Sequence, residues 1–160
     1  NPTTEMEGYG SHNVPKGSWS DDTSMTLATI DAIIQEKSIN YNVIATNFLE
    51  WMKNAKYTAN GKVFDIGRTS LTAISKFESK QEIAEKCGGI NELDNGNGSI
   101  MRILPLVYYC YSKNMEEKEI YEVVKNVSSI THGHEISIMG CFIYVMYGIE
   151  LLNVDIPFIA

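Results

Sequence analysis

The sequence has 160 residues, of which 44% are hydrophobic, and this is enough to build one ordinary domain with a packed core. The net charge of -7 and the isoelectric point near 4.9 argue against sequence-independent binding to nucleic acid or to an anionic membrane, because both need a surplus of lysine and arginine. The acidic surplus instead fits a soluble protein that holds cations.

The cysteine pattern and the two ends of the sequence suggest where the protein is found in the cell and whether the sequence is a fragment. Cys87, Cys110 and Cys141 are widely spaced and contain no Cys-x-x-Cys pair, so neither a disulfide framework nor a zinc ribbon is expected. No signal segment opens the chain, and no uncharged apolar run reaches about 18 residues, which favours a cytoplasmic protein that does not bind membranes. The chain starts at Asn1 and not at Met, and it ends in an apolar stretch, which suggests a fragment of a longer protein.

The first half of the chain predicts a loop and three helices. Residues 1–19 contain several glycines and read as an extended loop. Apolar residues then cover most of the circumference up to Ile34, which predicts a central and mostly buried helix with Ser20 or Asp21 as its N-cap. A second helix follows residues 40–42 and carries its apolar side chains on one face. A third runs from about Asp65 to Phe77, with Leu71, Ile74 and Phe77 pointing inward.

The second half predicts a glycine-rich loop and three more helices. The loop spans residues 88–99, where glycines permit close approach of the backbone to another group. A helix runs from near Arg102 to Tyr111, with Pro105 in its first turn. An amphipathic helix follows over 117–129. A last, apolar helix extends over about 135–152, where Gly140 and Cys141 permit close helix contact. No strand-like alternation persists, so we expect an all-α fold in a single domain over residues 1–160.

Four polar clusters share a position, because each lies where a loop meets a helix. They are Ser20-Asp21-Asp22-Thr23, Phe64-Asp65-Ile66-Gly67, Asn95-Gly96-Asn97-Gly98-Ser99 and Thr131-His132-Gly133-His134. Taken singly, each is more often a helix cap, a turn or a surface histidine than a functional site. Several helix starts can converge at one end of a bundle, however, and a cleft there would collect carboxylates, backbone N–H groups and a histidine. Hard oxygen ligands in such a cleft favour magnesium, manganese or calcium over zinc.

The order of these motifs and the residues within them resemble the ADP-ribosylglycohydrolase family, in particular the members that reactivate dinitrogenase reductase. The match consists of Gly17–Met25, Phe64–Gly67, Asn97–Leu106 and Thr131–His134, and it covers nearly the whole chain. The resemblance implies a compact orthogonal helical bundle, and hydrolysis of the N- or O-glycosidic bond between ADP-ribose and an acceptor. The partner would be an ADP-ribosylated protein or a small ADP-ribose conjugate, and the cofactor would be a binuclear Mg²⁺ or Mn²⁺ centre.

The resemblance also implies a role for particular residues. Ser20, Asp21 and Asp22 match the first metal-ligand cluster, although many family members have Thr where Ser20 stands. Asp65 matches the acidic residue that orients a water or the ribose, and with Asp22 it forms the catalytic pair. The ligand-binding positions are Asn97, Gly98, Ser99 and His132. These roles agree with a glycosidic bond that breaks through an oxocarbenium-like state beside carboxylates.

Two family motifs do not occur in this sequence: an early Gly-Asp-x-x-Gly segment and a late Gly-Asp-Thr-Asp cluster that supplies further metal ligands. By the resemblance they would lie before Asn1 and after Ala160, so the helical bundle and the metal site would both be incomplete here. Two other interpretations stay open. One is a noncatalytic structural or ADP-ribose-binding member of the family, and the other is a hydrolase for a different glycosidic substrate.

Overall fold

The computed structural model describes residues 4–154 of the chain, and these residues form helices joined by loops, with no β-strand among them. The α-helices are α1 (Asp21–Glu36), α2 (Tyr41–Asn54), α3 (Arg68–Glu78), α4 (Pro105–Ser112), α5 (Glu117–Ser129) and α6 (Glu135–Asn153). Short 3₁₀ turns are η1 (Ala84–Lys86), η2 (Glu92–Asp94) and η3 (Ile100–Arg102). The predicted all-α class is confirmed.

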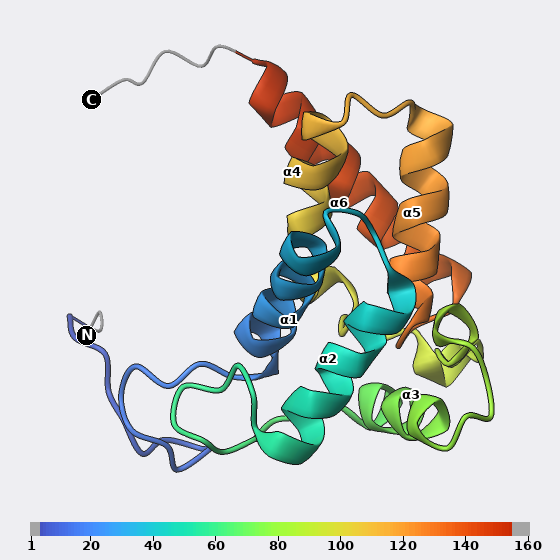
Figure 1. Cartoon of the computed structure of the whole chain (residues 1–160). Helices are drawn as coiled ribbons and strands as arrows, with labels where there is room; N and C mark the ends of the chain where they lie inside the picture. Colours follow the sequence, from blue (N-terminus) through green and yellow to red (C-terminus); the bar gives the residue numbers. More distant parts are fainter. Residues whose placement is uncertain (1–3, 155–160) are drawn as a thin grey trace.

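The helices pack as two pairs with a connecting turn between them (Figure 1). The first pair is α1 against α2, and the second is α5 against α6, with α4 also packed on α6. The turn η3 contacts both α1 and α6, so the segment that follows the glycine-rich loop lies between the two pairs. Its position matters for function, because η3 is preceded directly by Asn97, Gly98 and Ser99.

The core lies between these pairs and is made mostly of aliphatic side chains, with Phe48 and Trp51 as its fully buried aromatic residues. Phe48 and Trp51 of α2 are at most 1% exposed, and Met25 of α1 and Val124 of α5 are fully buried. Each such side chain contributes about 1.5–3 kcal/mol through removal of apolar surface from water. Cys87, Cys110 and Cys141 are buried as free thiols.

Three of the predicted helices differ from expectation. The helix expected from near Arg102 is α4, which starts at Pro105, because Arg102 belongs to the separate turn η3. The helix α1 is not mostly buried, because α2 and η3 cover one side of it while Leu27, Ile30 and Ile34 on the other side are exposed. The helix α3 starts at Arg68 and not at Asp65, because Asp65 has a left-handed backbone conformation that a helix cannot include. Leu71, predicted to point inward, is 43% exposed, whereas Ile74 is buried.

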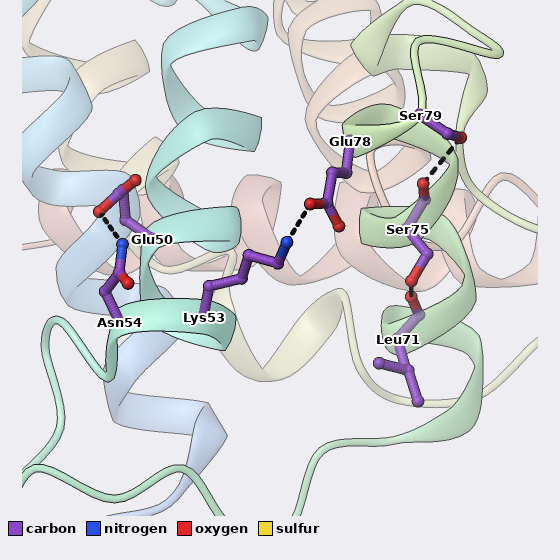
Figure 2. A network of polar contacts seen from close by, with 7 residues as sticks. All are labelled: Glu50, Lys53, Asn54, Leu71, Ser75, Glu78 and Ser79. Atoms are coloured by element: carbon purple, nitrogen blue, oxygen red, sulfur yellow. Dashed lines mark hydrogen bonds and ion pairs between the residues drawn. The ribbon is translucent and has the colours of Figure 1, made fainter.

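Polar side chains connect α2 with α3 on the outside of the molecule (Figure 2). Lys53 of α2 forms an ion pair with Glu78 at the end of α3. Within α3, the Ser75 hydroxyl donates to the backbone carbonyl of Leu71 over 2.8 Å. The ion pair is solvent-exposed, so it contributes little to stability, roughly 0–1 kcal/mol.

The last helix, α6, is long and apolar. By length and composition only, it is long and apolar enough to cross a membrane. In the structure it packs against both α4 and α5. The glycine that permits close helix contact is Gly148, not the predicted Gly140. A Cβ at Gly148 would lie 2.8 Å from Cγ2 of Val107 in α4, whereas the nearest atom at Gly140 is 3.9 Å away.

Candidate functional site

Residues from all four polar clusters of the sequence meet in one cleft. The cleft has a volume of about 300 Å³ and lies where the starts of α1 and α3 face the loop before η3. Its lining residues are Asp21, Asp22, Asp65, Gly67, Arg68, Thr69, Ser70, Gly96, Asn97, Gly98, Met101 and His132. The predicted convergence of helix starts on one cleft is therefore confirmed for the described part of the chain.

One wall of the cleft is the acidic start of α1. Ser20 is the N-cap residue, and Asp21 and Asp22 are the first two helical residues. The Ser20 hydroxyl makes no capping bond to the backbone; it donates instead to Oδ2 of Asp22 over 2.9 Å. Ser20 thus lies against the pair of carboxylates but does not line the cleft. The helix dipole favours negative charge at this position.

The carboxylate of Asp21 has an unusual protonation equilibrium. The pKa of Asp21 is raised to about 6, first by burial of the carboxyl group and then by the negative charges of Asp22 and Asp65. Asp21 is 7% exposed, whereas Asp22 is exposed. Three carboxylates therefore line one cleft and repel one another, which is an arrangement that a bound cation would stabilise.

Asp65 reaches this wall from the loop between α2 and α3. Its φ angle is +60°, and Asp is one of the few residues other than Gly that adopt this conformation readily. The loop is anchored beside the segment before α1, because the Trp19 indole N–H donates to the Tyr57 carbonyl over 2.9 Å. Figure 1 shows these two loops side by side. Nε2 of His12 lies 3.6 Å from Oδ2 of Asp65, a contact that the sequence did not predict.

The opposite wall is the glycine loop with His132. A Cβ at Gly98 would lie 2.5 Å from Cε1 and 3.0 Å from Nε2 of His132, so only glycine fits against this ring edge. At Gly96 the nearest atom, again Nε2 of His132, would be 3.6 Å away. The loop thus presents backbone and the exposed Asn97 to the cleft, while the imidazole lies behind it and is 3% exposed.

Ser99 lies apart from the other predicted ligand-binding residues. Its side chain is 1% exposed, and its hydroxyl accepts a hydrogen bond from the Cys141 thiol of α6 over 3.3 Å. It does not line the cleft. In this structure Ser99 fastens the glycine loop to α6, and the loop's contribution to the cleft comes from Gly96, Asn97 and Gly98.

The first two glycines of the glycine-rich segment approach protein backbone and not a ligand. Gly89 and His132 form an isolated parallel bridge, in which the Gly133 N–H donates to the Gly89 carbonyl over 2.9 Å. The Gly88 N–H donates to the Ser129 carbonyl over 2.8 Å, and a Cβ at Gly88 would lie 2.5 Å from that carbonyl oxygen. A side chain at 88 would push away the segment that carries His132, whereas a Cβ at 89 would lie 2.5 Å from the carboxylate of Asp94.

The start of α3 is a part of the cleft that sequence reasoning missed. Beyond Gly67, which belongs to a predicted cluster, Arg68, Thr69 and Ser70 also line the cleft, because α3 begins at Arg68. The first turn of a helix has free backbone N–H groups and a partial positive charge, so it suits an anion. The signal was present in the sequence as Gly67-Arg68-Thr69-Ser70, which reads as a helix start once Asp65 is excluded from the helix.

The donor set agrees in chemistry with a hard divalent cation but is incomplete in number. Carboxylate oxygens from Asp21, Asp22 and Asp65 are the type of ligand that Mg²⁺ and Mn²⁺ prefer. Within residues 4–154, however, no three His, Cys, Asp or Glu side chains are grouped closely enough to hold a metal ion. A cation at this wall would need further ligands or movement of the carboxylates.

Relatives of known sequence point to one enzyme family. The chain is 28% identical over 137 residues to ADP-ribosylarginine hydrolase Tri1 of Pseudomonas putida (strain GB-1), a match that covers 86% of this chain and 36% of the relative. It is 28% identical over 101 residues to the protein of the same name from Serratia proteamaculans (strain 568), covering 63% of this chain and 27% of that protein. The chain thus spans about a third of the length of these relatives.

A solved structure has the same fold. It is described as an ADP-ribosylglycohydrolase-related protein complex, and it superposes with a TM-score of 0.73 over 93% of this chain and 45% of its own, at 22% identity. The family model for ADP-ribosylglycohydrolase matches residues 1–157, and the motifs that it covers are those that line the cleft. The chain belongs to the ADP-ribosylglycohydrolase family.

Proposed function

We propose that the whole protein hydrolyses the glycosidic bond between ADP-ribose and an acceptor, and that the acceptor is an arginine side chain. The observation that carries this proposal is the single cleft in which Asp21, Asp22 and Asp65 face the Gly96–Gly98 loop and His132. Membership of the family supports the reaction class, and the names of two relatives support arginine as the acceptor.

The anionic part of ADP-ribose would bind at the start of α3 and along the glycine loop. Backbone N–H groups in the first turn of α3 can donate to a pyrophosphate without a lysine, and Arg68 adds a positive charge at the rim. The close approach of Gly98 to His132 keeps the loop free of side chains that would occupy this space. An acidic protein can therefore still bind an anion here.

The reacting end of the ligand would lie at the acidic wall. Mg²⁺ or Mn²⁺, held by Asp21 and Asp22 with the Ser20 hydroxyl nearby, would supply activation of a water and neutralisation of charge. Asp65 would orient that water or a ribose hydroxyl through its exposed carboxylate. Asp22 would act with Asp65 to stabilise positive charge as the bond to the acceptor breaks.

Conservative substitutions in the full-length protein test this function. Asp65→Asn keeps a residue that tolerates positive φ, so it removes the charge without straining the backbone. We expect kcat for release of ADP-ribose from an ADP-ribosylarginine peptide to fall about 100-fold in Asp65→Asn and in Asp22→Asn. Glu36→Gln, at the far end of the same helix as Asp22, should leave kcat unchanged. Wild-type turnover in both aspartate variants would overturn the proposal.

A noncatalytic, ADP-ribose-binding role is the second candidate. It is favoured by one observation, the lack of a complete metal-holding group among the described residues. Thermal shift separates the two candidates, since ligands that bind the folded state raise the melting temperature. A binding module would be stabilised by ADP-ribose equally with and without Mg²⁺ or Mn²⁺. The hydrolase requires a further rise with the metal, which Asp22→Asn should remove.

A further inference from the structure

Arg102 is buried in the middle of the molecule, and no carboxylate among residues 4–154 forms an ion pair with it. It is 0% exposed and its guanidinium carbon lies 4.7 Å from the centre of the Phe48 ring. Nη2 donates to the Val127 carbonyl over 3.2 Å and to the Thr131 hydroxyl over 2.7 Å. Nε and Nη1 have no hydrogen-bond partner among the described residues. Because a buried and incompletely paired cation is costly, packing alone does not explain an arginine at this position.

Thr131 connects Arg102 to the histidine of the cleft. Its hydroxyl oxygen lies 2.7 Å from Nη2 of Arg102 and 2.9 Å from Nδ1 of His132. Arginine can only donate, so the threonine oxygen accepts from Nη2. Its own hydrogen is then available for Nδ1, and residues 4–154 offer this fully buried hydroxyl no other bond. Nδ1 is therefore an acceptor, and the ring proton resides on Nε2.

The Nε2 edge of the ring is the edge that faces the glycine loop. The atoms nearest to Cβ positions at Gly96 and Gly98 belong to this edge, and His132 lines the cleft. Charge keeps the ring neutral as well. The pKa of His132 is lowered to about 4, mainly by burial and also by the positive charge of Arg102, while the negative charge of Asp94 acts in the opposite direction. A neutral ring with Nε2–H is a hydrogen-bond donor of fixed direction.

We propose that Arg102 and Thr131 are positioning residues, which hold His132 in the neutral Nε2–H tautomer so that it donates to an oxygen of the bound ligand. The ligand is ADP-ribose, so this part of the inference rests on the proposed function. The oxygen belongs to the pyrophosphate or the ribose, both of which accept hydrogen bonds. Arg102 does not touch the ligand; it acts through Thr131.

The tautomer can be measured without any ligand. In the ¹⁵N-labelled 160-residue chain at neutral pH, we expect a pyridine-like signal for Nδ1 and a pyrrole-like signal for Nε2 of His132. Thr131→Val has nearly the same shape but lacks the hydroxyl, and its signals should move toward a mixture of tautomers. Thr131→Ser keeps the hydroxyl and should retain the wild-type pattern. A wild-type ring protonated at Nδ1, or an unchanged pattern in Thr131→Val, would overturn the proposal. The wild-type measurement decides even if a variant fails to fold.

The consequence for binding is measured by calorimetry with ADP-ribose. We expect Thr131→Val to weaken binding roughly tenfold, because one hydrogen bond to a charged group is lost, and Thr131→Ser to bind within about twofold of wild type. A tautomer change with unaltered affinity would overturn the claim that His132 donates to the ligand. If the full-length wild-type protein does not bind ADP-ribose while the tautomer pattern of His132 is as expected, the proposed function fails and the positioning role of Arg102 and Thr131 stands.

Discussion

The imidazole of His132 is buried beside a fixed positive charge, and this couples the stability of the protein to pH. Its pKa falls from the ordinary 6.5 to about 4 in the folded state. Between these values the unfolded chain binds a proton that the folded chain does not bind. The contribution of His132 to stability is therefore complete above pH 6.5 and is lost progressively as the pH falls toward 4.

We predict that His132→Asn reduces this acid sensitivity, because Asn can still accept from the Thr131 hydroxyl but does not titrate. The free energy of unfolding of wild type, relative to the variant, should fall by about 3 kcal/mol from pH 6.5 to pH 4. Asp21 has a raised pKa and acts in the opposite direction over this range, but it is present in both proteins and cancels in the difference. Urea denaturation at several pH values measures the difference. Parallel curves for the two proteins would contradict the prediction.

The fit of Gly98 against His132 gives a second prediction for single residues. Gly98→Ala places a methyl group 2.5 Å from Cε1 of the ring, so the loop or the ring must move. We expect a loss of about 1–3 kcal/mol of stability, measured by chemical denaturation. Gly96→Ala is the matched control, since its Cβ meets nothing closer than 3.6 Å, and it should change stability by less than about 0.5 kcal/mol. Equal losses of stability in both variants would contradict the prediction, because they would show that the His132 ring moves aside from the added methyl group at little cost.

At the scale of elements, helix α6 contains two glycines with opposite surroundings. A Cβ at Gly148 would lie 2.8 Å and 2.9 Å from the two methyl carbons of Val107, whereas at Gly140 the nearest atom is 3.9 Å away. Alanine is the better helix former by about 0.5–1 kcal/mol, and overpacking costs about 1–3 kcal/mol.

We therefore predict opposite signs for the same substitution on one helix. Gly140→Ala should raise the melting temperature by a few degrees, and Gly148→Ala should lower it by more than that, as recorded by circular dichroism. If Gly148→Ala also stabilises, then α4 and α6 separate without cost, and the close contact at Val107 is not required.

The sequence predicted helices best where the ends were marked by local chemistry. The helix expected at 117–129 is α5 with the same bounds, because Glu116 and Glu119 form a capping box and the apolar residues recur at helical spacing. The start of α3 was misplaced by three residues, since the left-handed conformation of Asp65 leaves no mark in an apolar pattern. Which side of α1 is buried depends on where α2 and η3 pack against it, and this tertiary packing is not visible in the local sequence pattern.

At the scale of the whole molecule, the sequence predicted the main residues that line the cleft but not the contacts that hold them in place. The motif order indicated Asp21, Asp22, Asp65, the glycine loop and His132, and all of them meet. The sequence did not indicate that Ser99 faces α6, that Gly88 and Gly89 pack on the histidine segment, or that Arg102 lies behind it. These contacts join residues 25 or more positions apart, so no local spacing encodes them.

We predict poor turnover for the 160-residue chain alone. Two carboxylates and a hydroxyl on one wall bind Mg²⁺ weakly, because this ion requires nearly octahedral oxygen ligation and gives up water reluctantly. Incubation with ADP-ribosylarginine peptide and Mg²⁺ or Mn²⁺ should release little ADP-ribose. Steady release that Asp21→Ala abolishes would contradict the prediction, and it would place a working metal centre within these residues.

The bridge between Gly89 and His132 provides an internal reporter for the cleft. The Gly133 and Gly88 amides donate across two loops, to the Gly89 and Ser129 carbonyls, so each is released only when the loops separate. Their hydrogen-exchange rates therefore measure how often the wall that carries His132 opens, independently of catalysis or of any bound group. A ligand held by that wall should slow both amides together, and a ligand held only by the acidic wall should leave them unchanged.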